Sequence, residues 1–188
     1  MIILIVGRRG SGKTTAAKSL EKMGFTVKST GDVVREEIKN RGLPYNKKTD
    51  YEVSKWFNTE GREVLISRRL LRDFKGGKLV IEGLRTPEQI KEIKKITGEA
   101  PIIIAVKADF ETKVKRLLKR RRFKDETIDY LKRKDKQEIQ WGEDKVIEMA
   151  DYTIDNTNLD INEFREKVRD VVEKILKEES KGKNDQSN

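Results

Sequence analysis

Eight consecutive residues near the amino terminus have the types and the spacing that are needed to hold a chain of phosphates. They match the pattern G-x-x-x-x-G-K-[ST] in full, and they are Gly7, Arg8, Arg9, Gly10, Ser11, Gly12, Lys13 and Thr14. Glycines let the backbone turn so that successive N–H groups point at phosphate oxygens, and a following helix adds the positive end of its dipole. The pattern predicts a nucleoside triphosphate-binding loop, or P-loop.

Two side chains of this motif suit the chemistry of phosphate transfer. The ammonium group of Lys13 is placed to reach the β- and γ-phosphates, and the hydroxyl of Thr14 is placed to ligate Mg²⁺. We therefore predict ATP and Mg²⁺ as cofactors, and we include Thr15 among the nucleotide-binding residues. A glycine-rich turn without a ligand is the simpler alternative. The motif leaves the reaction open, because GTPases, helicases, switch ATPases and small kinases share it.

The elements that position this loop follow from an alternation of short β-branched runs with helical patterns. The expected strands are Ile2–Val6, Phe25–Ser29, Lys78–Glu82, Ile102–Lys107 and Asp151–Asp155. The expected helices are Lys13–Lys22, Asp32–Asn40, Tyr51–Phe74, Pro87–Ile96, Phe110–Arg120, Glu126–Glu138, Lys145–Met149 and Ile161–Leu176. Such alternation predicts an α/β fold, the three-layer sandwich of P-loop NTPases, with a parallel sheet of about five strands and helices on both faces.

Two connections are longer than a simple crossover requires. They predict a substrate-binding insertion over residues 30–77 and a basic lid over residues 113–138, within a single domain that spans residues 1–177. Residues 178–188 are polar and low in complexity, so we expect a disordered tail. No stretch approaches the roughly 20 apolar residues of a membrane span. The amino-terminal apolar run is too short for a signal peptide, so we expect a soluble, cytoplasmic protein.

The composition restricts the chemistry further. The 188-residue chain contains no His and no Cys, which excludes an imidazole base, a Ser-His-Asp triad, a thiol nucleophile and Cys-ligated zinc. Its formal net charge of +10 is typical of proteins that bind nucleic acid, anionic membranes or phosphorylated small molecules. The abundance of Lys and Glu without Cys favours a thermophilic source.

Two further segments place an Arg near the carboxyl end of an expected strand. Residues 29–35 read S-T-G-D-V-V-R, and residues 82–89 read E-G-L-R-T-P-E-Q. Ligands of open α/β sheets bind at this edge, and guanidinium forks suit phosphate. Arg35 and Arg85 therefore predict a second phosphate site opposite the P-loop. In simpler interpretations, Asp32 caps a helix and Arg35 is a solvated surface charge.

These segments resemble those of nucleoside monophosphate kinases. S-T-G-D-V-V-R is similar to the S-T-G-D-x-x-R segment of adenylate kinases, and E-G-L-R-T-P-E-Q is similar to their D-G-F-P-R-T-x-x-Q segment. The whole chain resembles a little-characterised archaeal family of adenylate-kinase-like P-loop proteins. Residues 150–156, A-D-Y-T-I-D-N, are also similar to a strand of dephospho-CoA kinases.

The resemblance implies roles for five acceptor-side residues. Thr30 and Arg35 would contact the acceptor and its phosphate. Gly83 and Arg85 would lie against the acceptor phosphate, which Arg85 would grip. Gln89 would read the edge of the base through hydrogen bonds. Each of these residues stands at the matching position of the family pattern.

The resemblance also implies a metal site. Asp32 or Glu82 would hold Mg²⁺ through water together with Thr14, and Asp32 would act as a base if the acceptor were a hydroxyl. The chain departs from the family here, because Glu82 stands in place of an Asp and Leu84 alone replaces a Phe-Pro pair. The longer carboxylate would shift the metal geometry, and the shorter turn would move Arg85. A structural ion pair with a nearby Lys is the simpler role for Glu82.

Most of the excess positive charge lies in residues 113–136, where nucleoside monophosphate kinases have the lid that supplies Arg to the transferring phosphoryl group. Residues 124–128, K-D-E-T-I, resemble the D-x-x-E-T-[IV] of such a lid. With Lys13 and Asp32, the predicted catalytic residues are therefore Arg120, Arg122 and Arg133. The alternatives are a solvated basic helix or a nucleic-acid surface, although aromatic side chains for base stacking are sparse.

These features favour an Mg²⁺–ATP-dependent kinase that transfers the γ-phosphate to a small phosphorylated acceptor, such as a nucleoside monophosphate. One alternative is a hydroxyl kinase similar to dephospho-CoA kinases. Another is a P-loop ATPase that works with nucleic acid or a ribonucleoprotein. Tyr51, Trp56 and Phe57 of the first insertion either line the acceptor pocket or belong to the core. The sequence does not indicate an oligomeric state.

Overall fold

All five expected strands form, and they pair in parallel to give one sheet with the order β2-β3-β1-β4-β5. The computed structural model describes residues 1–120, 122–123 and 126–185 of the chain. The strands are Ile2–Val6 (β1), Thr26–Ser29 (β2), Leu79–Glu82 (β3), Ile102–Lys107 (β4) and Tyr152–Asp155 (β5). The carboxyl ends of these strands therefore meet at one edge of the sheet, as the alternation predicted.

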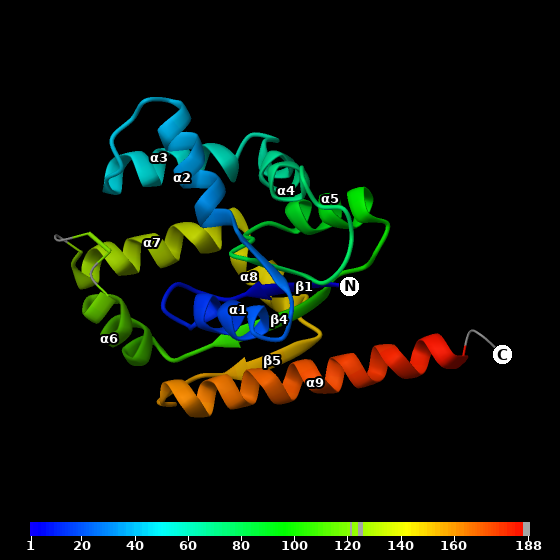
Figure 1. Cartoon of the computed structure of the whole chain (residues 1–188). Coiled ribbons are helices and arrows are strands. Elements are labelled where there is room, and N and C mark those ends of the chain that lie inside the picture. Colours follow the sequence, from blue (N-terminus) through cyan, green and yellow to red (C-terminus); the bar gives the residue numbers. More distant parts are fainter. Residues whose placement is uncertain (121, 124–125, 186–188) are drawn as a thin grey trace.

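Helices cover both faces of the sheet (Figure 1). Within the described residues they are Lys13–Glu21 (α1), Thr30–Asn40 (α2), Lys47–Phe57 (α3), Glu63–Leu71 (α4), Pro87–Thr97 (α5), Phe110–Arg120 (α6), Ile128–Trp141 (α7), Glu143–Glu148 (α8) and Ile161–Asp185 (α9). One layer contains α2, α3, α4, α5 and α8, and the other contains α1 and α9. This arrangement is the expected three-layer sandwich.

Strand β1 shows why a continuous apolar run predicts the centre of such a sheet. Ile2, Leu4 and Val6 pack with one helical layer, whereas Ile3 and Ile5 pack with the other. All five side chains are almost fully buried, because both faces of a central parallel strand are covered. The P-loop therefore begins at the end of the most constrained strand in the sheet.

The expected helix over residues 51–74 is in fact two helices, α3 and α4. The chain turns between them at Glu60 and Gly61, which both have positive φ angles, of 62° and 75°. A Glu in the left-handed region is uncommon, so the break between the two helices was not predicted. Helix α3 also starts earlier than predicted, because Asn46 and Thr49 form a capping box at its amino terminus.

The carboxyl-terminal helix α9 is longer than predicted. It continues to Asp185, so residues 178–185 of the predicted disordered tail are helical. The Lys and Glu residues of this stretch are polar, which suggested a tail, but both have high helix propensity. None of the described helices is long and apolar enough to cross a bilayer.

The predicted insertion and the predicted lid approach each other above the sheet edge (Figure 1). The side-chain amide of Gln137, on α7, donates to the hydroxyl of Tyr51, on α3, at 2.7 Å. Phe57 belongs to the core, since it is fully buried. Trp56 is partly buried and packs against Arg41 and Arg62. Tyr51 is therefore the member of the trio Tyr51, Trp56 and Phe57 that contacts α7 of the predicted lid.

Candidate active site

The P-loop connects β1 to α1 in a conformation that needs glycine at two points. Gly7 and Gly12 have φ angles of 138° and 115°. A Cβ atom on Gly7 would lie 2.2 Å from the carbonyl oxygen of Val106, and one on Gly12 would lie 2.5 Å from the side-chain nitrogen of Asn156. The loop is therefore packed tightly against the ends of β4 and β5, which fixes its backbone.

Lys13 lies across its own loop. Its ammonium group donates to the carbonyl oxygens of Gly7 and Arg8, the latter at 3.0 Å. Burial lowers the pKa of Lys13, and the nearby carboxylates of Glu143 and Glu138 oppose this shift. The cation is thus held at the place in the loop where a bound phosphate chain needs it.

Thr14 and Glu82 meet at the start of α1, as the predicted metal site requires. The Thr14 hydroxyl donates to the two carboxylate oxygens of Glu82 at 3.0 and 3.2 Å. Glu82 ends β3 and is only 8% exposed. A hydroxyl beside a carboxylate matches the donors that Mg²⁺ uses at P-loops. No group of three acidic side chains that could enclose a cation occurs in the described residues, so phosphate and water oxygens would complete the coordination.

Asp32 lies apart from this pair. Its carboxylate forms an ion pair with Arg35 one helical turn later, at 2.5 Å, and its side chain is 72% exposed. The cap of α2 is Ser29, whose hydroxyl accepts from the amide of Gly31, so the helix-cap interpretation of Asp32 was wrong. The contacts of Asp32 also do not support the predicted metal contact.

One cavity of about 640 Å³ brings the donor and acceptor residues together. Of the predicted site residues it contains Arg9, Gly10, Gly12, Lys13, Thr14, Thr15, Thr30, Asp32, Arg35, Glu82, Gly83, Arg85, Arg120 and Arg122. Gly7, Arg8, Ser11, Gln89 and Arg133 do not line it. We call this space the transfer cavity.

Arg85 is fixed in the wall of the transfer cavity. Its Nε and Nη2 atoms donate to one carboxylate oxygen of Glu138 at 3.2 and 3.0 Å, and Nη1 donates to the carbonyl of Gly83 at 2.9 Å. The hydroxyl of Thr30 donates to that same carbonyl at 2.9 Å, and Thr30 is buried. The guanidinium of Arg85 is therefore held in a fixed orientation by protein groups.

Gln89 does not have the predicted role. The side chain is fully buried, its carbonyl accepts from the amides of Arg85 and Thr86, and its amide donates to Asn58 at 2.9 Å. Thr86 and Gln89 form the capping box of α5. Its polar groups are satisfied by these contacts, so Gln89 has no free edge with which to read a base.

The three predicted lid arginines lie in different surroundings. Arg122 donates to the carboxylate of Asp50 at 2.9 Å and to the hydroxyl of Tyr45, so it joins the lid to the insertion. Arg120 lines the transfer cavity. Arg133 instead lines a separate pocket between α3 and α7, so its predicted catalytic contact is not supported.

Three of the five residues of the predicted lid pattern, residues 126–128, can be placed. Lys124 and Asp125, with Arg121, lie outside the described residues. The carboxylate of Glu126 approaches the guanidinium of Arg9 at 3.7 Å, and Thr127 caps α7. The base of the lid is thus tied directly to the P-loop.

Comparisons with known proteins place the chain in a family. A family model described as "AAA domain" matches residues 3–140. A UPF0200 protein from Pyrococcus horikoshii is 37% identical over 187 residues, covering 94% of this chain and 98% of that protein. The chain belongs to the UPF0200 family. A UPF0200/UPF0201 protein from Archaeoglobus fulgidus is 33% identical, and this UPF0200 chain spans only 56% of its length.

The fold of this UPF0200 protein is also that of known kinases. The structure is similar to shikimate kinase from Acinetobacter baumannii in complex with shikimate, with a TM-score of 0.62 and 20% identity. The match covers 94% of this chain and 93% of that one. The P-loop kinase-like fold expected from the sequence is confirmed.

Two buried carboxylates of this UPF0200 protein were missed by the sequence analysis. Glu138 and Glu143 are each 2% exposed, near Lys13 and Arg85. Burial and the charge of Glu138 raise the pKa of Glu143 to about 7. Burial alone would raise the pKa of Glu138, but Arg85 and Arg9 lower it. Glu138 lies seven residues after the apolar Leu131 on α7, so both occupy the same face of the helix. This spacing is the one sequence signal for the burial of Glu138.

Arg116 was missed as well. Its guanidinium donates to the carbonyl of Asn156 at 2.9 Å and lines the transfer cavity. The side-chain amide of Asn156 donates to the P-loop carbonyl of Ser11 at 2.7 Å. Asn156, at the end of the A-D-Y-T-I-D-N segment, therefore holds the backbone of the P-loop in place. This role is structural.

Proposed function

We propose that this UPF0200 protein is an Mg²⁺–ATP-dependent phosphotransferase that transfers the γ-phosphate of ATP to a small phosphorylated acceptor, a nucleoside monophosphate. The observation that carries the proposal is the transfer cavity. It joins Lys13 and Thr14 of the P-loop to Arg35, on α2, and to Arg85, which follows β3. Cations from these separate segments around one cavity match a donor phosphate chain and an acceptor phosphate.

On the donor side, the backbone amides of the P-loop and the start of α1 bind the phosphates. Lys13 neutralises charge that develops on the transferring group. Thr14 and Glu82 would hold Mg²⁺, which would supply positive charge to offset that of the phosphates. The bond between the γ-phosphorus and the bridging oxygen to the β-phosphate breaks, and a new bond forms to an acceptor phosphate oxygen.

On the acceptor side, positioning is the main contribution of the protein. Glu138 orients the guanidinium of Arg85 toward the cavity through two hydrogen bonds. The contact of Arg122 with Asp50 joins the lid to the insertion across the cavity. Joining these two segments excludes water, which limits hydrolysis of ATP when no acceptor is present.

A hydroxyl kinase is the second candidate, and the position of Asp32 favours it. This exposed carboxylate lines the transfer cavity and is not used in the metal pair of Thr14 and Glu82. A carboxylate there could accept the proton of an acceptor hydroxyl, whereas a phosphate acceptor needs no base.

The test is release of ADP from ATP in the presence of each candidate acceptor. The panel contains the ribonucleoside and deoxyribonucleoside monophosphates, dephospho-CoA and a short RNA. We expect a nucleoside monophosphate to stimulate ADP release, and we expect Lys13→Ala to abolish the stimulation. Stimulation by dephospho-CoA alone would favour the hydroxyl kinase. Stimulation by RNA alone would contradict both.

A further inference from the structure

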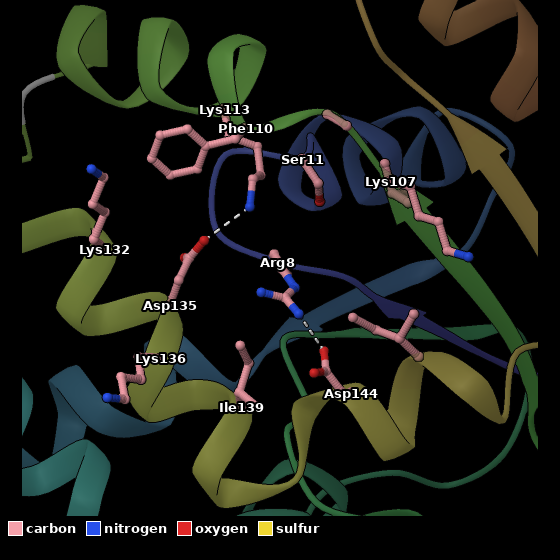
Figure 2. A pocket seen from close by; sticks show the side chains of 13 residues that line it. Arg8, Ser11, Lys107, Phe110, Lys113, Lys132, Asp135, Lys136, Ile139 and Asp144 are labelled. Carbon is pink, nitrogen blue, oxygen red and sulfur yellow. Dashed lines mark hydrogen bonds and ion pairs between the residues drawn. The ribbon is translucent and has the colours of Figure 1, made fainter. Parts of the chain in front are cut away.

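A second cavity, of about 580 Å³, lies beside the P-loop and is bounded by the end of β4 and by α6, α7 and α8. Figure 2 shows its position between these elements. Its volume is within the range of about 300–1,000 Å³ that is typical of small-molecule sites. Two P-loop residues, Arg8 and Ser11, form part of its wall, although the transfer cavity does not include them. We call this space the outer cavity.

The outer cavity carries more positive than negative charge. Its two acidic residues are already paired, since Asp144 binds Arg8 at 2.7 Å and Asp135 binds Lys113 at 2.9 Å (Figure 2). The remaining charged residues of its lining are Lys107, Lys132 and Lys136. None of these lysines forms an ion pair within the part of the chain that the structure describes. An anion is the ligand that would balance them.

An apolar surface lies next to these charges. Phe110 is 43% exposed and Ile139 is 36% exposed, and both line the outer cavity. The ammonium groups of Lys113 and Lys132 each lie 5.8 Å from the centre of the Phe110 ring. An exposed aromatic ring flanked by cations can stack on a flat ring that carries a negative group.

The P-loop adds an unused polar group to the same place. Ser11 is 1% exposed, and its hydroxyl oxygen has no hydrogen-bond partner in the described residues. A buried hydroxyl without a partner is unfavourable by about 1–3 kcal/mol. Ser11 thus gives the wall of the outer cavity a polar atom that no described residue bonds.

From these observations we infer that the outer cavity binds a second nucleotide, with its base against Phe110 and its phosphate at Lys132, Lys136 and Arg8. The bound phosphate would compete with Asp144 for the guanidinium of Arg8. Because Arg8 belongs to the P-loop, occupation of the outer cavity is coupled to the loop that binds the donor. The site is separate from the transfer cavity and does not depend on which acceptor is phosphorylated.

The experiment is titration calorimetry with ADP on the full chain. Because the donor and acceptor sites of the transfer cavity can also bind ADP, the wild-type protein is expected to bind one molecule of ADP more than those sites take. The double variant Lys132→Ala/Lys136→Ala is expected to keep the sites of the transfer cavity, with the additional site weakened by about tenfold for each lysine removed. Both lysines are exposed, so the fold is expected to persist. The matched control, Lys167→Ala/Lys177→Ala on α9, loses the same charge at exposed positions and is expected to bind ADP as the wild-type protein does.

Equal ADP stoichiometry and equal affinities in the wild-type protein and the double variant overturn the inference. A short RNA that the double variant fails to bind, while both proteins bind ADP equally, would overturn the assignment to a nucleotide. If the double variant loses one ADP site but the wild-type protein phosphorylates no acceptor, the proposed function fails and the outer site stands.

Discussion

Apart from Glu82, the donor side of the transfer cavity is made from one short stretch of chain, whereas the acceptor side is assembled from residues far apart in the sequence. Lys13 is bonded to a carbonyl five residues away. Arg85 is bonded to Glu138, 53 residues away, and Arg122 to Asp50, 72 residues away. The donor side therefore depends mainly on local backbone geometry. The acceptor side depends on how the insertion and the lid pack.

The two sides also hold their cations differently. Lys13 donates hydrogen bonds to carbonyl oxygens of its own loop, and Glu143 and Glu138 act on it through their charge alone. Arg85 is hydrogen-bonded to the buried carboxylate of Glu138. Replacing Lys13 therefore breaks no ion pair among the described residues, whereas replacing Arg85 leaves the carboxylate of Glu138 without its hydrogen-bonded partner.

The largest effect is expected from Lys13→Ala. This substitution should lower kcat by about 10³-fold, since it removes a preorganised charge from the transferring group. The melting temperature should fall slightly, because replacing Lys13 breaks no ion pair in the described part of the chain but removes a charge that offsets those of the buried Glu143 and Glu138. Steady-state kinetics and thermal unfolding would be compared with Lys22→Ala, at an exposed position that follows α1. Retained turnover would show that Lys13 of the P-loop does not act in phosphate transfer.

Glu82→Gln should weaken the binding of Mg²⁺ more than the binding of the nucleotide. We expect the Mg²⁺ concentration for half-maximal activity to rise by about 10- to 100-fold, the usual effect of losing a residue that holds a metal or its ligands. Thr14 would keep a hydrogen-bond acceptor in the amide carbonyl, so the fold should persist. An unchanged Mg²⁺ requirement would show that the carboxylate acts as a structural partner alone.

Arg85→Lys tests the acceptor side with the charge retained. The lysine cannot reproduce the guanidinium fork, so we expect the KM for the acceptor to rise by about tenfold while the KM for ATP is unchanged. Arg69→Lys is the matched control, since Arg69 pairs with Glu37 outside the transfer cavity. An equal effect on both substrates would mean that the two sides are not separate.

Glu143→Gln should change the pH dependence of stability. The pKa of Glu143 is raised from 4.5 to about 7 in the folded protein, so the folded state keeps this proton longer than the unfolded state. Its contribution to stability is therefore present below about pH 4.5 and is lost as the pH rises toward 7. The variant lacks this loss.

The expected difference for Glu143→Gln is small. As the pH rises from 5 to 8, the Tm of the variant should increase relative to that of the wild-type protein. The increase should be about 2–4 °C for each kcal/mol of unfolding free energy that the wild-type protein loses. Glu148→Gln, at an exposed position on the same helix, should follow the wild-type pH profile. Identical slopes for Glu143→Gln and the wild-type protein would contradict the buried, protonatable state of Glu143.

The difference between the locally built donor side and the acceptor side assembled from distant residues explains how much could be predicted from the sequence. The sheet and the P-loop follow from local patterns and from the meeting of parallel strands at one edge. Of the two carboxylates that the resemblance implied beside Thr14, Glu82 contacts it and Asp32 pairs with Arg35 instead. Gln89 was predicted wrongly, because T-P-E-Q fits both a base-reading segment and a helix start, and only burial separates the two. Glu138 and Glu143 were missed, because charged helical residues are usually solvated.

The most direct test of the central claim follows the γ-phosphate itself. The protein would be incubated with ATP labelled at the γ-phosphate and with each nucleoside monophosphate, and the products would be separated and identified by mass. We predict label in a nucleoside diphosphate with the wild-type protein and none with Lys13→Ala. Label found only in inorganic phosphate, whichever acceptor is present, would contradict the assignment of a phosphotransferase.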